Sequence, residues 1–279
     1  MKRLFWAGGF LLMLLTAGYA AVSAPAAGNP GVLKTTYLGN EGFLIEGGGK
    51  KVLIDALFDN GWGRYTTPPA DVMSHMMAGE APFDGIDLLL VTHSDYDHIN
   101  PQFVIAYLRQ HPHTRLIAHK QAVDEMRGKP GFGDVEGQID EIASDPGEQS
   151  SLTVNGIAVD VLCLDHSHPA DKPAETRNLA FAVVLGGARF LHMGDAPIEQ
   201  NIAALETYPF ERKHVDLLFL PVWDLSPGSR KLIAERIKPA KIVAMHLQEA
   251  KIEAERKAFD DVYPHAVAFG KPMESATFP

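Results

Sequence analysis

Residues 87–98 read DLLLVTHSDYDH and are the most informative segment of this 279-residue chain. The first half is a continuous apolar run, which is typical of a strand buried on both faces. The second half places four potential metal ligands within six residues: His93, Asp95, Asp97 and His98. An extended loop alternates its side chains, so the first three point one way, and His98 can turn in where the chain bends into a helix. Imidazole and carboxylate together suit zinc, manganese or iron, so the segment predicts a metal site at a strand end.

Two structural explanations compete with metal binding here. Asp97 could cap the helix expected from Pro101, and His93 could be a histidine satisfied within the core. The presence of four such residues together favours a metal site. Acids and imidazoles also follow other expected strands, where an α/β scaffold usually places its chemistry. They occur in Asp165-His166-Ser167-His168, in His192-Met193-Gly194-Asp195 and in Met245-His246.

The rest of the chain alternates expected strands and helices. Strands are predicted at 32–37, 43–46, 51–55, 87–92, 116–118, 157–164, 179–185, 189–192, 217–220 and 241–245. Helices are predicted at 101–110, 121–127, 198–206, 231–237 and 250–259, and 59–84 as a long loop with one short helix at most. This order predicts an α/β fold with two mixed sheets between helical layers. No linker follows residue 31, so 32–279 is expected to form one domain.

The order of these motifs resembles the metallo-β-lactamase superfamily. The motifs are Gly39-Asn40-Glu41-Gly42-Phe43, Leu53-Ile54-Asp55, residues 92–98, 164–168, 192–196 and 244–246. The resemblance implies an αββα four-layer sandwich that holds two divalent metal ions, zinc first, with manganese or iron as alternatives. The implied ligands are His93, Asp95, Asp97, His98, a histidine at 166 or 168, Asp195 and His246.

Within that set, the resemblance divides the ligands between two sites. His93 and Asp95, with His166 or His168, would hold the first metal; His166 fits the family's register better, and the choice stays open. The adjacent pair 97–98 and His246 would hold the second metal, Asp195 would bridge the two, and Asp55 would support the loops from behind. Asp95 departs from the family's His-x-His-x-Asp-His pattern, which leaves open the metal preference and whether both sites fill.

Such a centre predicts a hydrolase that cleaves an ester, lactone, amide or phosphoester bond in a small molecule with a metal-activated water. Asp97 would ligate and hold the water, and His246, Tyr96 or a loop histidine would protonate the leaving group. An iron-dependent oxidoreductase of the same fold and a non-catalytic exported binding protein are the alternatives. Loops 56–85 and 169–177 are expected to select the substrate, together with the segment Pro221-Val222-Trp223-Asp224. Apolar residues of the first loop would either wall the metals or pack the loop down: Trp62, Tyr65, Met73, Met76, Met77 and Phe83.

Charge and the N-terminus set the expected partners and location. The net charge of −10 argues against a nucleic-acid partner. Residues 1–24 begin with Lys2 and Arg3, continue through an apolar run and end in small residues, which is the pattern of a secretory signal peptide. The run is too short for a comfortable membrane span, although an uncleaved anchor is an alternative. We therefore expect a periplasmic or secreted protein with a linker at 25–31, no stable membrane insertion after cleavage, and an oligomeric state that the sequence does not indicate.

Overall fold

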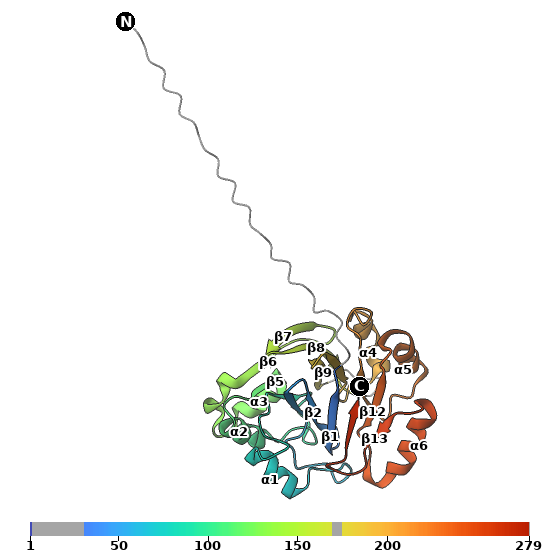
Figure 1. The fold of residues 1–279 in the computed structure, drawn as a ribbon, viewed down its shortest axis with the longest axis horizontal. Coiled ribbons are helices and arrows are strands. Elements are labelled where there is room, and N and C mark those ends of the chain that lie inside the picture. Colours follow the sequence, from blue (N-terminus) through green and yellow to red (C-terminus); the bar gives the residue numbers. More distant parts are fainter. Residues whose placement is uncertain (2–30, 169–174, 279) are drawn as a thin grey trace.

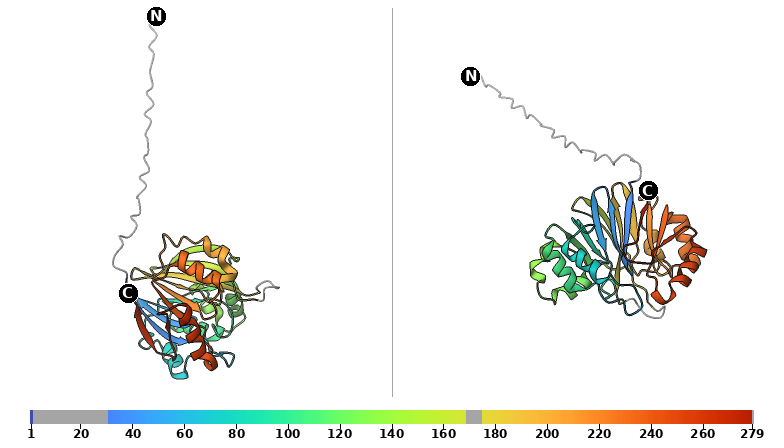
Figure 2. Two further views of the ribbon diagram at one scale, coloured as in Figure 1. Left: turned by 90° about the vertical axis from the view of Figure 1, so that its right-hand side faces the viewer. Right: turned by 60° about the horizontal axis from the view of Figure 1, so that its bottom comes forward.

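The computed structural model describes Met1 and residues 31–168 and 175–278. Two seven-stranded sheets pack face to face, and helices cover both outer faces (Figures 1 and 2). The predicted αββα four-layer sandwich is confirmed. Apart from Met1, the signal peptide predicted at 1–24 lies outside the described residues, as do most of the 25–31 linker and residues 169–174 of the second substrate loop. None of the described helices is long and apolar enough to cross a membrane.

The first sheet has the strand order β14-β1-β2-β3-β4-β5-β6. Its pairing is antiparallel from β14 to β3 and parallel from β3 to β6. The strands are β1 (Leu33–Gly39), β2 (Gly42–Gly47), β3 (Lys50–Ile54), β4 (Leu88–Val91), β5 (Arg115–His119), β6 (Ile139–Ile142) and β14 (Ser275–Phe278). Its helices are α1 (Ala70–Ala78), α2 (Pro101–Gln110) and α3 (Lys120–Arg127), followed by short 3-10 turns at Phe132–Asp134 and Glu136–Gln138.

The second sheet has the order β13-β12-β11-β10-β9-β8-β7 and repeats the scheme, with antiparallel pairing from β7 to β10 and parallel pairing from β10 to β13. The strands are β7 (Gln149–Val154), β8 (Ile157–Asp165), β9 (Arg177–Leu185), β10 (Ala188–His192), β11 (Leu217–Pro221), β12 (Lys241–Met245) and β13 (Val267–Ala268). Its helices are α4 (Ile198–Glu206), α5 (Pro227–Leu232) continued by a π-helical turn (Ile233–Ile237), and α6 (Ile252–Val262) after a 3-10 turn (Glu249–Lys251).

Strand alternation divides the apolar residues between two cores. On β4, Leu88 and Leu90 belong to the core between the sheets, whereas Leu89 and Val91 belong to the core under α1–α3. The continuous apolar run of this strand therefore serves both faces, as the sequence predicted. On β2, Phe43 faces the other sheet and packs its ring 4.8 Å from that of a phenylalanine on β11.

Most predicted elements are confirmed, and the differences have physical causes. β6, β7, β13 and β14 were not predicted. β7 and β14 lie at sheet edges and alternate exposed with partly buried residues, so they lack a long apolar run. α5 begins at Pro227, four residues before the predicted start, because the Ser226 side chain caps it by accepting a hydrogen bond from the Ser229 amide. The helix predicted within the 59–84 loop is α1.

Asp160 on β8 is a buried acid at the centre of a polar cluster that we expect to make stability depend on pH. Its carboxylate accepts hydrogen bonds from Ser151, Lys213, Tyr208 and Arg189 at 2.6–3.1 Å. Burial alone would raise its pKa, but these donors lower it below the ordinary value. The stabilisation is therefore present above the unfolded-state pKa of about 3.9 and is lost as pH falls through the lower folded-state pKa.

Asp160→Asn is expected to reduce the free energy of unfolding by about 1–3 kcal/mol at pH 7. Urea unfolding at pH 7 and at pH values near 3 measures this. The difference between wild type and variant should shrink on acidification; a difference that stays constant over this range would contradict the role given to the carboxylate.

Candidate metal centre

In the loop after β4, His93, Asp97 and His98 are buried and Asp95 is partly exposed. A different residue caps the following helix. The Asn100 side chain accepts hydrogen bonds from the backbone amides of Gln102 and Phe103 at 3.0 and 3.4 Å, and so caps α2. Asp97 is thereby free of the capping role that competed with ligation, and it is only 4% exposed. His93 and His98 are fully buried, at 0% and 1% exposed.

A first ligand group joins the two sheets. His93 and Asp95 follow β4, His166 follows β8, and one possible ligand atom from each lies within 4.8 Å of the others. His93 places Nδ1 2.9 Å from the Thr92 hydroxyl, which itself donates to Asp55, so Nδ1 carries the proton. Its buried Nε2 has no hydrogen-bond partner among the described residues and is left to accept a metal.

His166, rather than His168, lies in this group. The His166 Nδ1 donates to the Ser167 carbonyl at 2.9 Å, and its Nε2 faces Asp95 at 3.7 Å and Asp195 at 3.3 Å. His168 instead contacts the His166 carbonyl through Nδ1 at 2.8 Å and belongs to no ligand group in the described part of the chain.

A second ligand group consists of Asp97, His98 and His246, again within 4.8 Å of one another. The Asp55 carboxylate accepts from His98 Nδ1 at 3.0 Å, which turns Nε2 toward the acids. The same carboxylate accepts from the Thr92 amide and hydroxyl at 2.9 and 2.6 Å. Asp55 therefore fixes both the ring of His98 and the start of the ligand loop.

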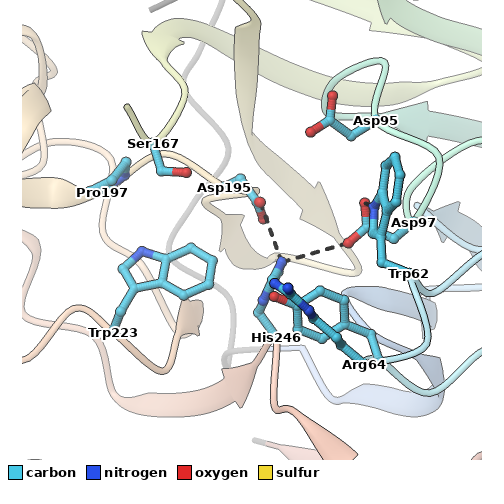
Figure 3. Close-up of a pocket in the computed structure, with 10 residues that line it drawn as sticks. Trp62, Arg64, Asp95, Asp97, Ser167, Asp195, Pro197, Trp223 and His246 are labelled. Atoms are coloured by element: carbon cyan, nitrogen blue, oxygen red, sulfur yellow. Dashed lines mark hydrogen bonds and ion pairs between the residues drawn. The ribbon is translucent and has the colours of Figure 1, made fainter. Parts of the chain in front are cut away.

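Asp195 lies between the two groups. Its carboxylate oxygens are 3.3 Å from Nε2 of His166, 3.3 Å from Nε2 of His246 and 3.5 Å from Nε2 of His98. Figure 3 shows His246 with Asp195 on one side and Asp97 on the other. Burial would raise the pKa of Asp195, but His246 and His98 outweigh it and hold the pKa well below the ordinary value. An ionised carboxylate placed between two imidazole-rich groups is suited to bridge two cations.

The protonation states differ among the histidines of the site. Burial, reinforced by His98, holds the pKa of His93 well below its ordinary value, so the ring is neutral and can ligate. Burial opposes the charge on His98 as well, but the carboxylates of Asp195 and Asp55 outweigh it and raise the pKa to about 10. A metal would displace that proton, because histidine ligates in its neutral form.

Unsatisfied buried polar atoms concentrate here, and they test whether the residues fit a metal. Buried polar atoms normally find a hydrogen-bond partner. Within the described ranges, those without one at this site are Asn40 Oδ1, both carboxylate oxygens of Glu41, His93 Nε2, His166 Nε2, Asp195 Oδ1 and His246 Nδ1. Imidazole nitrogens and carboxylate oxygens are the donors that divalent transition metals take, so the residues present fit one or two such ions.

Several residues support the centre through contacts that the sequence did not predict. Asn40 Nδ2 and Trp62 Nε1 donate to the two oxygens of Asp97 at 3.1 and 2.9 Å. His192, in the His-Met-Gly-Asp motif, donates from Nε2 to the Glu41 carbonyl at 3.0 Å, and Nδ1 accepts from the Gly194 amide. Burial lowers the pKa of His192 to about 4, so the ring is neutral at pH 7. It links the two sheets through its hydrogen bond to the Glu41 carbonyl.

A pocket of about 360 Å³ opens over the ligands. It is lined by Trp62, Arg64, Tyr65, Asp95, Asp97, Ser167, Asp195, Pro197, Trp223 and His246. Of the apolar residues proposed as a wall, Trp62 and Tyr65 do line it, whereas Met76 and Phe83 are buried in the core under α1–α3. Met76 and Phe83 therefore pack their segment against the domain and do not form a wall over the candidate metal ligands.

A family model described as a beta-lactamase superfamily domain matches residues 34–246. The chain belongs to this superfamily. A UPF0173 metal-dependent hydrolase of Polynucleobacter asymbioticus is 28% identical over 268 residues, which cover 88% of this chain and 86% of that protein. A second protein of that name, from Aeropyrum pernix, is 24% identical over 88% of this chain and 97% of its own length. These names support the prediction of a metal-dependent hydrolase.

Solved structures of the superfamily share the fold. Igni18, a metallo hydrolase from Ignicoccus hospitalis, matches with a TM-score of 0.58 at 17% identity, over 89% of this chain and 99% of that chain. YhfI from Bacillus subtilis, a metallo-beta-lactamase fold protein, matches with a TM-score of 0.57 at 16% identity, over 88% and 99%. At these identities the likeness establishes the architecture alone.

Proposed function

We propose that this protein is an exported hydrolase that uses two divalent metal ions to cleave an ester, lactone, amide or phosphoester bond in a small molecule. The observation that carries the proposal is the meeting of two three-residue ligand groups on one carboxylate, Asp195. Bound metals would supply an activated water and polarise the bond to be broken. The export part rests on the N-terminal sequence pattern.

The chain's own residues would hold the reacting groups in place. Asp97 is fixed through both oxygens by Asn40 and Trp62, so its orientation does not depend on the substrate. His246 lies against the rings of Tyr65 and Trp223, with centroids 4.1 and 4.4 Å away. With His246 engaged as a ligand, a leaving-group proton needs another source, and burial raises the pKa of Tyr65 to about 12, so its hydroxyl keeps a proton at neutral pH.

The pocket walls favour a substrate with a flat apolar part and an anionic group. Trp62 and Trp223 stand on opposite sides of His246 in Figure 3. Arg64 lines the same pocket and forms no ion pair with any carboxylate in the described ranges, so its guanidinium is available to a carboxylate or phosphate of the substrate. Arg64 adds positive charge to a pocket that otherwise presents three aspartates to the ions.

A reconstitution experiment tests the proposed activity. The purified chain is stripped with a chelator, reloaded with zinc, manganese or iron, and offered ester, lactone, amide and phosphodiester substrates in neutral and anionic forms. We expect hydrolysis of at least one class, loss after chelation and recovery with metal. Asp97→Asn should lower kcat/KM by more than about 100-fold, since loss of an outer-shell partner alone costs 10–100-fold.

Asp260→Asn, an exposed change on α6, is the matched control and should retain full activity. Metal-loaded protein that hydrolyses none of these substrates would contradict the proposal. So would an Asp97→Asn variant as active as wild type. Iron-loaded protein that consumes dioxygen without hydrolysis would favour the oxidoreductase instead.

A further inference from the structure

Glu41 is a buried acid that the ligand set above does not use. It lies in the tight turn between β1 and β2, and it is 0% exposed. The turn is pressed against the ligand loops: a Cβ at Gly42 would lie 2.7 Å from the Asp55 carbonyl oxygen. On the opposite side, His192 from the second sheet donates to the Glu41 carbonyl at 3.0 Å. Both sheets therefore fix the backbone that carries this side chain.

The Glu41 carboxyl group lies among the acids of the site, and burial together with Asp195 and Asp55 raises its pKa well above the ordinary value. Neither oxygen has a hydrogen-bond donor within the described part of the chain. A carboxylate oxygen of Glu41 lies within 4.8 Å of ligand atoms of Asp195 and His246, and one also lies within that distance of Asp55 and His98. A buried carboxylate among other acids is strongly unfavourable unless a cation or a hydrogen-bond donor compensates it.

We propose that Glu41 is an additional metal ligand on the side of the centre formed by His98, Asp195 and His246. The inference rests on the proposed metal centre. It explains why a fully buried acid sits with two free oxygens beside groups that would themselves ligate. With Asp95, Asp97 and Asp195, it brings four carboxylates to the centre, and such an oxygen-rich set favours manganese or iron over zinc.

Metal titration of Glu41→Gln tests this assignment. Glutamine keeps the size and shape of the side chain, removes its charge and can donate to a neighbouring carboxylate. We expect the metal-free variant to be at least as thermally stable as metal-free wild type, and its manganese affinity to fall by about 10–100-fold. A merely structural role for the carboxylate would give the opposite pattern, a less stable metal-free protein with unchanged affinity.

Asp224→Asn is the matched control. Asp224 is also a buried acid with an unpartnered oxygen, but it belongs to none of the ligand groups in the described residues. The manganese affinity of the Asp224→Asn variant should equal that of wild type. An equal affinity in Glu41→Gln would overturn the Glu41 assignment while the metal centre stands. Wild-type protein that binds no metal would overturn the centre itself, so the two failures are distinguishable.

A structure of the manganese-loaded wild type decides the point even where a variant does not fold. A Glu41 oxygen at about 2.0–2.6 Å from an ion is the result expected for a ligand. An ion on His98 and His246 with the Glu41 oxygens beyond hydrogen-bond distance would overturn the assignment.

Discussion

Asp195→Asn is expected to remove metal from both halves of the centre and to lower kcat/KM by more than about 100-fold. The carboxylate reaches His166 of the first ligand group and both His98 and His246 of the second at 3.3–3.5 Å. No other acid in the described residues contacts both groups so closely, so one neutralised side chain affects two sites. Elemental analysis and steady-state kinetics of the variant measure the two effects together.

Asp165→Asn is the control for this prediction. Asp165 lies next to His166 in sequence but belongs to no ligand group in the part of the chain described. Its metal content and activity should match wild type. If Asp195→Asn retained about two ions per chain, the bridging role would be wrong. If it lost one ion only, the carboxylate would serve a single site.

Gly194→Ala is expected to destabilise the fold by about 2–4 kcal/mol and to displace Asp195 from the centre. Gly194 has φ +56°, and an added Cβ would collide with the Asn178 side chain and lie 2.8 Å from the Thr92 Cβ. Asn178 also accepts from the Asp195 amide at 2.9 Å, so the collision would break the contact that aims this ligand. Chemical unfolding and metal content report the two consequences.

The Gly49→Ala variant measures the strain of alanine at a positive φ without the collision that an added Cβ causes at Gly194. Gly49 also has a positive φ, +75°, but an added Cβ there meets nothing within 4 Å. It should cost about 1 kcal/mol, the strain of the left-handed conformation alone, and leave metal binding intact. Equal losses in the two variants would mean that crowding at Gly194 plays no part.

Much of the architecture could be predicted because its signals are local. The apolar run that forms β4 marks a doubly covered strand, and Pro101 marks the start of α2. The resemblance supplied the candidate ligands that the structure brings together, including the grouping of Asp97 with His98 and His246. These residues lie close together because the loops that follow the strands of both sheets meet at one rim.

Contacts between segments that are far apart in the sequence could not be predicted from local sequence patterns. Asn40 and Glu41 stand in a motif that contributed to the family resemblance but received no role at the site. Their approach to the centre depends on how β1 and β2 pack against the second sheet. The contact of Trp62 with Asp97 joins a loop to a strand end 35 residues later. Edge strands such as β7 and β14 carry too few apolar residues to be recognised as strands from the sequence.

Anomalous diffraction from crystals of the metal-loaded wild-type protein tests the central claim most directly. We expect two ions, one coordinated by His93, Asp95 and His166 and the other by Asp97, His98 and His246, with Asp195 touching both. Metal peaks elsewhere, or none at this rim after loading, would contradict a two-metal hydrolytic centre.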